Sequence, residues 1–239
     1  MDLRNQSALV TGGASGMGAV TASALAARGA RVAVLDINQT AAQDKADEFG
    51  GVGIACDVAD AQSAASAVER VVAEIGPPRV VVNCAGIALA GRIVGRDGPH
   101  DLGDYQKVIS VNLIGTFNVL RLTAATMSEL EVIGDSGGRG VIINTASVAA
   151  YDGQIGQAAY SASKGGVVGM TLPIARDLAN VGVRIMTIAP GLFKTPLLLG
   201  LPQDVQDSLG ATVPFPSRLG EPNEYASLAK HIVENQMLN

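Results

Sequence analysis

The sequence predicts a doubly wound α/β fold, with one parallel sheet between two layers of helices, formed by a single domain over residues 1–239. Short apolar runs alternate regularly with segments of helical period. The runs are apolar on both faces, as in parallel strands that helices cover on either side. A glycine-rich turn joins the first run to the first helical segment, at the edge of such a sheet where ligands bind.

The predicted strands are short, and helical crossovers of right-handed sense would place them side by side in parallel. They are residues 8–11, 31–36, 53–56, 80–83, 140–144 and 184–188. The predicted helices are residues 16–28, 39–49, 61–75, 104–129, 158–180, 202–209 and 221–235. Polar, glycine-rich insertions occupy residues 88–103 and 131–139, and no linker rich in Ser or Pro divides the chain.

The composition indicates a core of small aliphatic side chains. Of the 239 residues, 48% are hydrophobic and only 3% aromatic, and 29 are glycine. Abundant Val, Ile and Leu exclude a disordered chain. A net charge of −5 and so few aromatic rings leave neither a basic face nor stacking platforms, so we expect no nucleic-acid partner.

Residues 5–27 carry no charge and are long enough to span a bilayer, but they include four glycines and many polar side chains. We therefore expect no membrane contact. No apolar leader segment follows residues 1–4, which favours a cytoplasmic location, with the mitochondrial matrix as the alternative. Cys56 and Cys84 match no metal-binding spacing, so we expect no metal and interpret both as small core residues in a reducing compartment.

The glycine-rich turn after the first strand predicts a dinucleotide site. Gly12 allows a tight turn, Gly16 lets the backbone approach a pyrophosphate, and Gly18 allows close packing of helix on strand. The following helix offers free N–H groups at its positive end. The absence of a Gly-Lys-Ser/Thr sequence excludes a P-loop. The predicted contacts in this turn are Gly12, Ser15, Gly16, Met17 and Gly18.

The second strand ends in Asp36, at the position where a carboxylate can bind the 2′-hydroxyl of an adenosine ribose. A 2′-phosphate would face this negative charge, and no Lys or Arg lies in residues 37–44. The sequence therefore predicts NAD rather than NADP. Asp36 could instead cap the next helix, although Asn38 is better placed to do so. Further cofactor contacts are predicted after the third and fourth strands, at Asp57, Val58, Asn83, Ala85 and Gly86.

A candidate catalytic group follows the fifth strand. Tyr160 and Lys164 are one helical turn apart and share a helix face, and Ser147 lies upstream of them. A tyrosine acting as a base near neutral pH needs its pKa lowered from about 10 by roughly 2–3 units. A neighbouring ammonium and an oxidised nicotinamide can provide this, while Ser147 holds the substrate oxygen. A Tyr–Lys pair alone is common as packing, but Ser147 and the dinucleotide turn favour catalysis.

Asn112 lies inside the predicted helix 104–129, although Asn is a poor residue for a helix interior because its side chain competes for backbone hydrogen bonds. It could hold a water that relays protons to Lys164. The alternative is a buried Asn that its neighbours satisfy.

These motifs, in this order and spacing, resemble the short-chain dehydrogenase/reductase family over essentially the whole chain. The resemblance implies a Rossmann-type fold and a catalytic tetrad of Asn112, Ser147, Tyr160 and Lys164. It also implies cofactor contacts at Pro190, Gly191, Phe193 and Thr195.

Residues 153–157, 189–193 and 213–219 are similar to members of that family that oxidise (S)-3-hydroxyacyl-CoA to 3-oxoacyl-CoA, some of them also described as hydroxysteroid dehydrogenases. This resemblance implies that Gln154 contacts substrate. A 3-oxoacyl carrier-protein reductase would prefer NADPH, against which Asp36 argues. A non-catalytic NAD-binding scaffold would lose Tyr160 or Lys164, and both are present.

The family pattern also raises an expectation about assembly and the sheet edge. Small residues along the helix of Tyr160 would allow a second helix to approach, and the family resemblance implies a homotetramer or homodimer. Pro173 should break or kink this helix. Members of the family continue beyond the position of Asn239 with a last apolar strand, so we expect the sheet to lack that strand.

Overall fold

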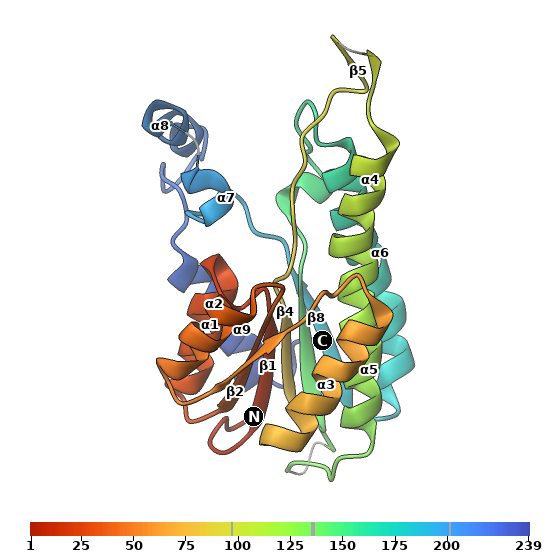
Figure 1. Cartoon of the computed structure of the whole chain (residues 1–239). Helices are drawn as coiled ribbons and strands as arrows, with labels where there is room; N and C mark the ends of the chain where they lie inside the picture. The colour runs from red at the N-terminus through yellow and green to blue at the C-terminus, as the bar shows by residue number, and fades with distance from the viewer. Residues whose placement is uncertain (97, 135–136, 201) are drawn as a thin grey trace.

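The computed structural model describes residues 1–96, 98–134, 137–200 and 202–239, and its centre is a six-stranded parallel sheet with helices on both faces (Figure 1). The strand order is β3-β2-β1-β4-β7-β8, so the chain reverses its direction of winding between β3 and β4. This arrangement confirms the predicted fold class. The strands are β1 Ser7–Thr11, β2 Arg31–Asp36, β3 Val52–Ala55, β4 Val80–Asn83, β7 Gly140–Thr145 and β8 Val183–Ile188.

The two helical layers bury separate cores against the sheet (Figure 1). One face packs on α1 Gly16–Ala26, α2 Gln39–Asp47 and α9 Pro222–Glu234. The other packs on α3 Ala61–Ile75, α5 Gly115–Ser128 and α6 Ala158–Ala179. The strand residues between them are almost fully buried, which explains why the sequence shows apolar runs without alternation.

The long helix predicted over residues 104–129 begins earlier and changes its geometry in the middle. It consists of α4 Leu102–Ile109, a π-helical turn Ser110–Ile114 and α5. Within the part of the chain that the structure describes, this is the one helix long and apolar enough to cross a membrane, and half of its apolar window is buried inside the fold. Core helices of this kind pass the same test.

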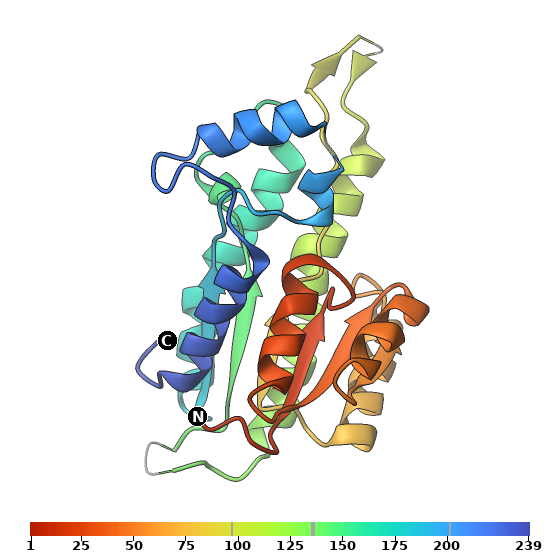
Figure 2. The same cartoon turned by 90° about the vertical axis from the view of Figure 1, so that its left-hand side faces the viewer.

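Several short elements were not predicted. The insertion at residues 88–103 contains an antiparallel pair, β5 Val94–Gly95 and β6 Gly98–Pro99, that projects from the body of the molecule (Figure 1). The short α7 Pro196–Leu199, which was also not predicted, and α8 Gln203–Ala211, which confirms the helix predicted over residues 202–209, lie beyond the carboxyl end of the sheet (Figure 2). Both additions therefore lie at the end of the sheet that carries the glycine-rich turn.

Pro173 was expected to break or kink its helix, and the break is wrong, because α6 continues through Pro173 to Ala179. Proline removes one backbone donor and crowds the carbonyl four residues earlier, which here belongs to Gly169. Both residues lie on the exposed side of the helix, and a Cβ at Gly169 would have no neighbour within 4 Å. The carbonyl that loses its donor can therefore turn to water.

The strand β8 forms one edge of the sheet. The side chain of Asn239 takes one of its hydrogen-bonding positions, since Asn239 Oδ1 accepts from the Ile185 amide at 2.9 Å. A groove of about 300 Å³ runs beside this edge, between β8 and α6.

Candidate active site

The glycine-rich turn lies so close to neighbouring segments that side chains could not be added. A Cβ on Gly12 would be 2.7 Å from the backbone of Ala85, and one on Gly18 would be 2.2 Å from the Gly12 carbonyl oxygen. Gly12 and Gly16 also have positive φ angles of 59° and 54°, which favour glycine. The turn is therefore a bare backbone cradle, as the pyrophosphate of a dinucleotide requires.

The helix α1 begins inside this turn, at Gly16. Ser15 is its N-cap residue, but the Ser15 side chain makes no capping hydrogen bond. The first N–H groups of α1 therefore point out of the turn without a side-chain acceptor from the cap, which is the arrangement that binds an anion. Gly16 also lies close to Thr195, a predicted cofactor contact. A Cβ on Gly16 would be 3.8 Å from Thr195 and 3.1 Å from Pro196 Cδ.

Asp36 is placed as the sequence predicts, between the glycine turn and α2. Its carboxylate accepts from the Ala14 amide at 3.3 Å and from the Asn38 amide at 3.2 Å. The cap of α2 is Asn38, whose side chain accepts from the Ala41 amide at 3.1 Å. Asp36 is therefore not the helix cap, and its half-buried carboxylate lies beside the turn.

The strand ends β3 and β4 contribute the next part of the same surface. Val58 is buried against Gly115, where a Cβ would lie 2.6 Å from Val58 Cγ2, and Asp57 Oδ1 accepts from the Ala59 amide at 2.9 Å. Asn83 is buried and donates to Asn144 Oδ1 at 2.9 Å. Its amide thus joins β4 to β7, so a cofactor contact of Asn83 would run through its backbone.

Tyr160, Lys164 and Ser147 come together at the carboxyl end of the sheet. Lys164 Nζ is 5.7 Å from the centre of the Tyr160 ring, one turn away on α6. Ser147, just after β7, lies close enough to the Tyr160 phenol for its hydroxyl to act against the rise in the Tyr160 pKa. Lys164 is only 4% exposed, and its ammonium donates to the backbone carbonyl of Thr145 at 2.7 Å.

Burial moves both pKa values in this pair. It raises the pKa of Tyr160, while the Ser147 hydroxyl acts in the opposite direction. Burial lowers the pKa of Lys164 to about 8, so the side chain is mostly an ammonium at pH 7. The protein alone therefore keeps Tyr160 protonated at neutral pH. A further positive charge beside the phenol is needed before Tyr160 can act as a base.

Asn112 lies fully buried in the π-helical turn and uses its whole amide. Its Oδ1 accepts from the Ile87 amide at 2.8 Å, and its Nδ2 donates to the Ile87 carbonyl at 2.9 Å and to Ser163 Oγ at 3.1 Å. A Cβ at Gly86 would be 3.6 Å from Lys164 Nζ. Asn112 thus fixes the segment after β4 beside the lysine. The proton relay through a water stays a prediction.

The remaining predicted residues lie around the same opening. The Pro190 carbonyl accepts from the Val148 amide at 2.9 Å, which ties the segment containing Gly191 to the segment of Ser147. Phe193 packs against Gly220, where a Cβ would be 2.8 Å from the Phe193 ring. Gln154 is exposed in the loop before α6.

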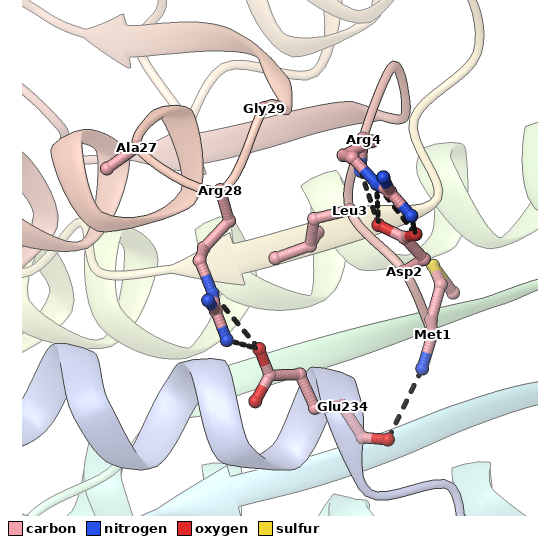
Figure 3. A pocket seen from close by; sticks show the side chains of 8 residues that line it. All are labelled: Met1, Asp2, Leu3, Arg4, Ala27, Arg28, Gly29 and Glu234. Atoms are coloured by element: carbon pink, nitrogen blue, oxygen red, sulfur yellow. Dashed lines mark hydrogen bonds and ion pairs between the residues drawn. The ribbon is translucent and has the colours of Figure 1, made fainter.

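A separate pocket of about 580 Å³ lies at the other end of the sheet, where the first residues meet the ends of α1 and α9 (Figure 3). Its charged groups are paired with one another, Arg4 with Asp2 at 2.5 Å and Arg28 with Glu234 at 2.6 Å. Strand amino ends are not where sheets of this class bind ligands. Over the residues that the structure describes, no group of three His, Cys, Asp or Glu side chains could hold a metal.

The cradle, the strand order and the Tyr–Lys pair define a dinucleotide-dependent enzyme fold, and comparison with known proteins identifies its family. The chain belongs to the short-chain dehydrogenase family, whose pattern matches residues 6–206.

Individual relatives are more specific. The chain is 54% identical to 3-hydroxyacyl-CoA dehydrogenase type-2 of Bos taurus over 237 residues, which cover 97% of this chain and 90% of that protein. The 3-hydroxyacyl-CoA dehydrogenase type-2 of Drosophila melanogaster is 51% identical over 99% of this chain and 94% of that protein. The crystal structure of 3-hydroxyacyl-CoA dehydrogenase type-2 from Mycobacterium avium superposes with a TM-score of 0.91 at 40% identity, covering 98% of this chain and 92% of that one. This chain is therefore similar to these proteins over nearly its whole length.

The lowered pKa of Lys164 predicts a pH-dependent stability. A lysine whose pKa is about 8 in the folded state and 10.5 when unfolded binds fewer protons folded than unfolded between these values, so stability rises with pH there. Compared with Lys164→Met, the wild type should gain up to about 3 kcal/mol in free energy of unfolding from pH 8 to 10.5. Urea unfolding across this range measures it.

Lys107→Met, which changes an exposed lysine on α4, is the matched control and should keep the wild-type pH dependence. Parallel curves for the wild type and Lys164→Met would show that the buried ammonium carries no such cost.

Proposed function

We propose that the protein oxidises (S)-3-hydroxyacyl-CoA to 3-oxoacyl-CoA with NAD, or catalyses the reverse reduction. The observation that carries the proposal is the contact of Ser147 with Tyr160 beside the buried Lys164, next to a glycine cradle. The substrate class comes from relatives at 51–54% identity that are named 3-hydroxyacyl-CoA dehydrogenase type-2.

The residues present fit NAD. At Gly12 and Gly18 a Cβ would collide with backbone, so only glycine permits this tight turn and the close packing of α1 that brings its first N–H groups to a pyrophosphate. Asp36 supports NAD over NADP, since its carboxylate suits a ribose hydroxyl and repels a phosphate. When bound, the nicotinamide supplies a hydride acceptor and a positive charge.

The chain's own residues handle the proton. Ser147 donates a hydrogen bond to the substrate oxygen and holds it beside Tyr160. Tyr160 Oη takes the hydroxyl proton as the C3–H bond breaks, the hydrogen leaving with its electron pair as hydride. The Lys164 ammonium stabilises the phenolate form of Tyr160, and the Thr145 carbonyl keeps that ammonium in place at 2.7 Å. In the reverse direction Tyr160 returns the proton to the substrate oxygen.

Simple activity assays distinguish the proposed reaction from its alternatives. Hydroxysteroid oxidation and a carrier-protein reductase use the same proton transfer, and relatives at 36% identity are named (3R)-3-hydroxyacyl-CoA dehydrogenase. Turnover of both enantiomers of 3-hydroxybutyryl-CoA, followed at 340 nm, therefore decides the stereochemistry. A scaffold without activity would bind NADH and turn over none of them.

Replacing Tyr160 by Phe should lower kcat/KM with (S)-3-hydroxybutyryl-CoA by about 100-fold or more, because the base is lost. NADH binding, measured by fluorescence titration, should stay within about threefold of the wild type since the ring remains. Tyr151→Phe changes an exposed tyrosine before the same helix and should keep full activity. Undiminished turnover by Tyr160→Phe would contradict the mechanism.

Replacing Asp36 by Ser should move the cofactor preference from NAD toward NADP. A hydrogen bond to a charged group is worth roughly 1.5–3 kcal/mol, so the ratio of kcat/KM for NAD over NADP should fall about tenfold to 100-fold. Asp44→Asn, an exposed charge on α2, serves as the control and should leave the ratio unchanged. The interpretation of Asp36 fails if both variants show the wild-type ratio.

We also propose that copies of this chain associate through α5 and α6. Ile114, Phe117 and Leu172 are 51%, 46% and 58% exposed, so this side of the molecule carries large apolar side chains in water. The neighbouring surface of α6 consists largely of alanine and glycine, which permits close helix contact.

The double variant Phe117→Lys, Leu172→Lys should then shift the mass measured by light scattering from a multiple of 24.3 kDa toward 24.3 kDa. Leu228→Lys, at a 45% exposed position on α9, should leave the mass unchanged. A wild type with the mass of a single chain would contradict the proposed association.

A further inference from the structure

Behind Lys164, three polar side chains from three distant segments form a closed group. Cys84 follows β4, Thr145 ends β7, and Tyr225 lies on α9. Thr145 Oγ1 and the Tyr225 hydroxyl are 2.7 Å apart, and Cys84 Sγ is 3.6 Å from each of them. Thr145 and Tyr225 are only 6% and 2% exposed. We call this group the hydroxyl–thiol triad. Among the hydrogen bonds of the described residues, the Thr145 side chain has no partner outside it.

The directions of the hydrogen bonds in the triad can be assigned by counting donors. Thr145 donates to Cys84 Sγ, and Cys84 donates to the Tyr225 hydroxyl. The bond between Thr145 and Tyr225 must then have the phenol as donor, so each group donates once and accepts once. Burial raises the pKa of both Cys84 and Tyr225, which keeps all three groups neutral at physiological pH. The triad is therefore satisfied without any ionised member.

Thr145 connects this triad to the catalytic lysine. Its side chain belongs to the triad, whereas its backbone carbonyl accepts from Lys164 Nζ at 2.7 Å. Thr145 is the last residue of β7, where regular pairing with β8 ends, and Ser147 follows two residues later. The Thr145–Ala146 peptide is held on the side of β8, because the Ala146 amide donates to the Ile188 carbonyl at 2.8 Å. The triad adds a second anchor through the Thr145 side chain, on which the direction of the Thr145 carbonyl also depends.

We propose that Tyr225 is a positioning residue: its hydroxyl holds Thr145 so that the Thr145 carbonyl keeps the Lys164 ammonium beside Tyr160. Phenylalanine would fill the same space on α9 equally well, so packing alone does not require the hydroxyl. The kinetic consequence of this inference rests on the proposed function, whereas the placement of Lys164 does not.

The surroundings of Lys164 make its protonation a sensitive reporter of this support. The titratable groups that face it are Tyr160 on its own helix and Cys84 after β4, and Tyr225 on α9 reaches it through Cys84 and Thr145. The carbonyl of Thr145 favours the charged form of Lys164, and burial opposes it. Loosening the carbonyl should therefore lower the pKa of Lys164 further.

The direct test is ¹³C NMR of protein labelled at the lysine Cε, without cofactor or substrate. The sequence contains five lysines, and Lys164→Arg assigns the signal. In Tyr225→Phe, the pKa of Lys164 should fall by about half a pH unit or more. Thr145→Val should act in the same direction, and Thr145→Ser, which keeps the hydroxyl, should restore most of the wild-type value. An unchanged or higher pKa in Tyr225→Phe and Thr145→Val overturns the proposal.

Thr21→Val is the matched control. Thr21 on α1 is fully buried on the face of the sheet that also carries α9 and Tyr225. Its hydroxyl donates to the Met17 carbonyl at 2.7 Å. This variant also removes one buried hydroxyl, but it should leave the pKa of Lys164 unchanged. An equal shift in Thr21→Val would mean that general loosening of the core, rather than the triad, moves the lysine, and would also overturn the proposal.

Kinetics separate this inference from the proposed function. With (S)-3-hydroxybutyryl-CoA, Tyr225→Phe should lower kcat about fivefold, the rate equivalent of one hydrogen bond, with KM for NAD within about twofold. The acid limb of its pH profile should move to higher pH, because Tyr160 loses part of the charge that favours its phenolate. If the wild type fails to turn over this substrate, the proposed function is wrong, and the NMR shift still decides the role of Tyr225.

Discussion

The arrangement of this site depends on one buried ammonium. Lys164 is almost fully enclosed, and among the described residues its side chain is paired with a backbone carbonyl rather than with a carboxylate. Burying a charge without an opposite charge is costly, and for this reason burial lowers the pKa of Lys164 to about 8. A carboxylate partner would offset part of the cost, but in the proposed mechanism it would also weaken the field that acts on Tyr160. The Thr145 carbonyl therefore fixes the position of the Lys164 ammonium without neutralising its charge.

The fold provides the supports for this charge at one place. Because the winding reverses as the chain passes from β3 to β4, β1 and β4 are neighbours in the sheet. Their carboxyl ends carry the glycine turn and the segment of Ala85 and Gly86. Asn112 fixes that segment from a π-helical turn, a local widening that is frequent at functional sites. Thr145, at the end of the neighbouring β7, supplies the acceptor for Lys164. Supports from both helical layers thus converge on a single side chain.

Much of this could be predicted from the sequence, because its signals are local. Apolar runs and helical periods placed the strands of the sheet to within a residue or two, and the spacing of Tyr160 and Lys164 was sufficient to place both on one helix face. The π-helical turn was not predictable, since its residues also fit an ordinary helix. The continuation of α6 through Pro173 depends on an exposed Gly169 carbonyl one turn earlier, which no local pattern shows.

The least predictable part is the support of Lys164. A backbone carbonyl has no residue type, so nothing in the sequence marks Thr145 as its acceptor. Tyr225 reads as an apolar position of an amphipathic helix, and only the folded chain brings its hydroxyl within 2.7 Å of Thr145.

In the proposed mechanism, the Lys164 ammonium, together with a bound oxidised nicotinamide, brings the phenol of Tyr160 into the range of a base near neutral pH. Tyrosinate absorbance near 295 nm, titrated with NAD⁺ present, tests it directly in a chain with four tyrosines. In the wild type one tyrosine should ionise roughly 2–3 units below the ordinary value of about 10. That step should be absent from Tyr160→Phe and should move toward 10 in Lys164→Met. An early titration that persists unchanged in Lys164→Met would contradict the account.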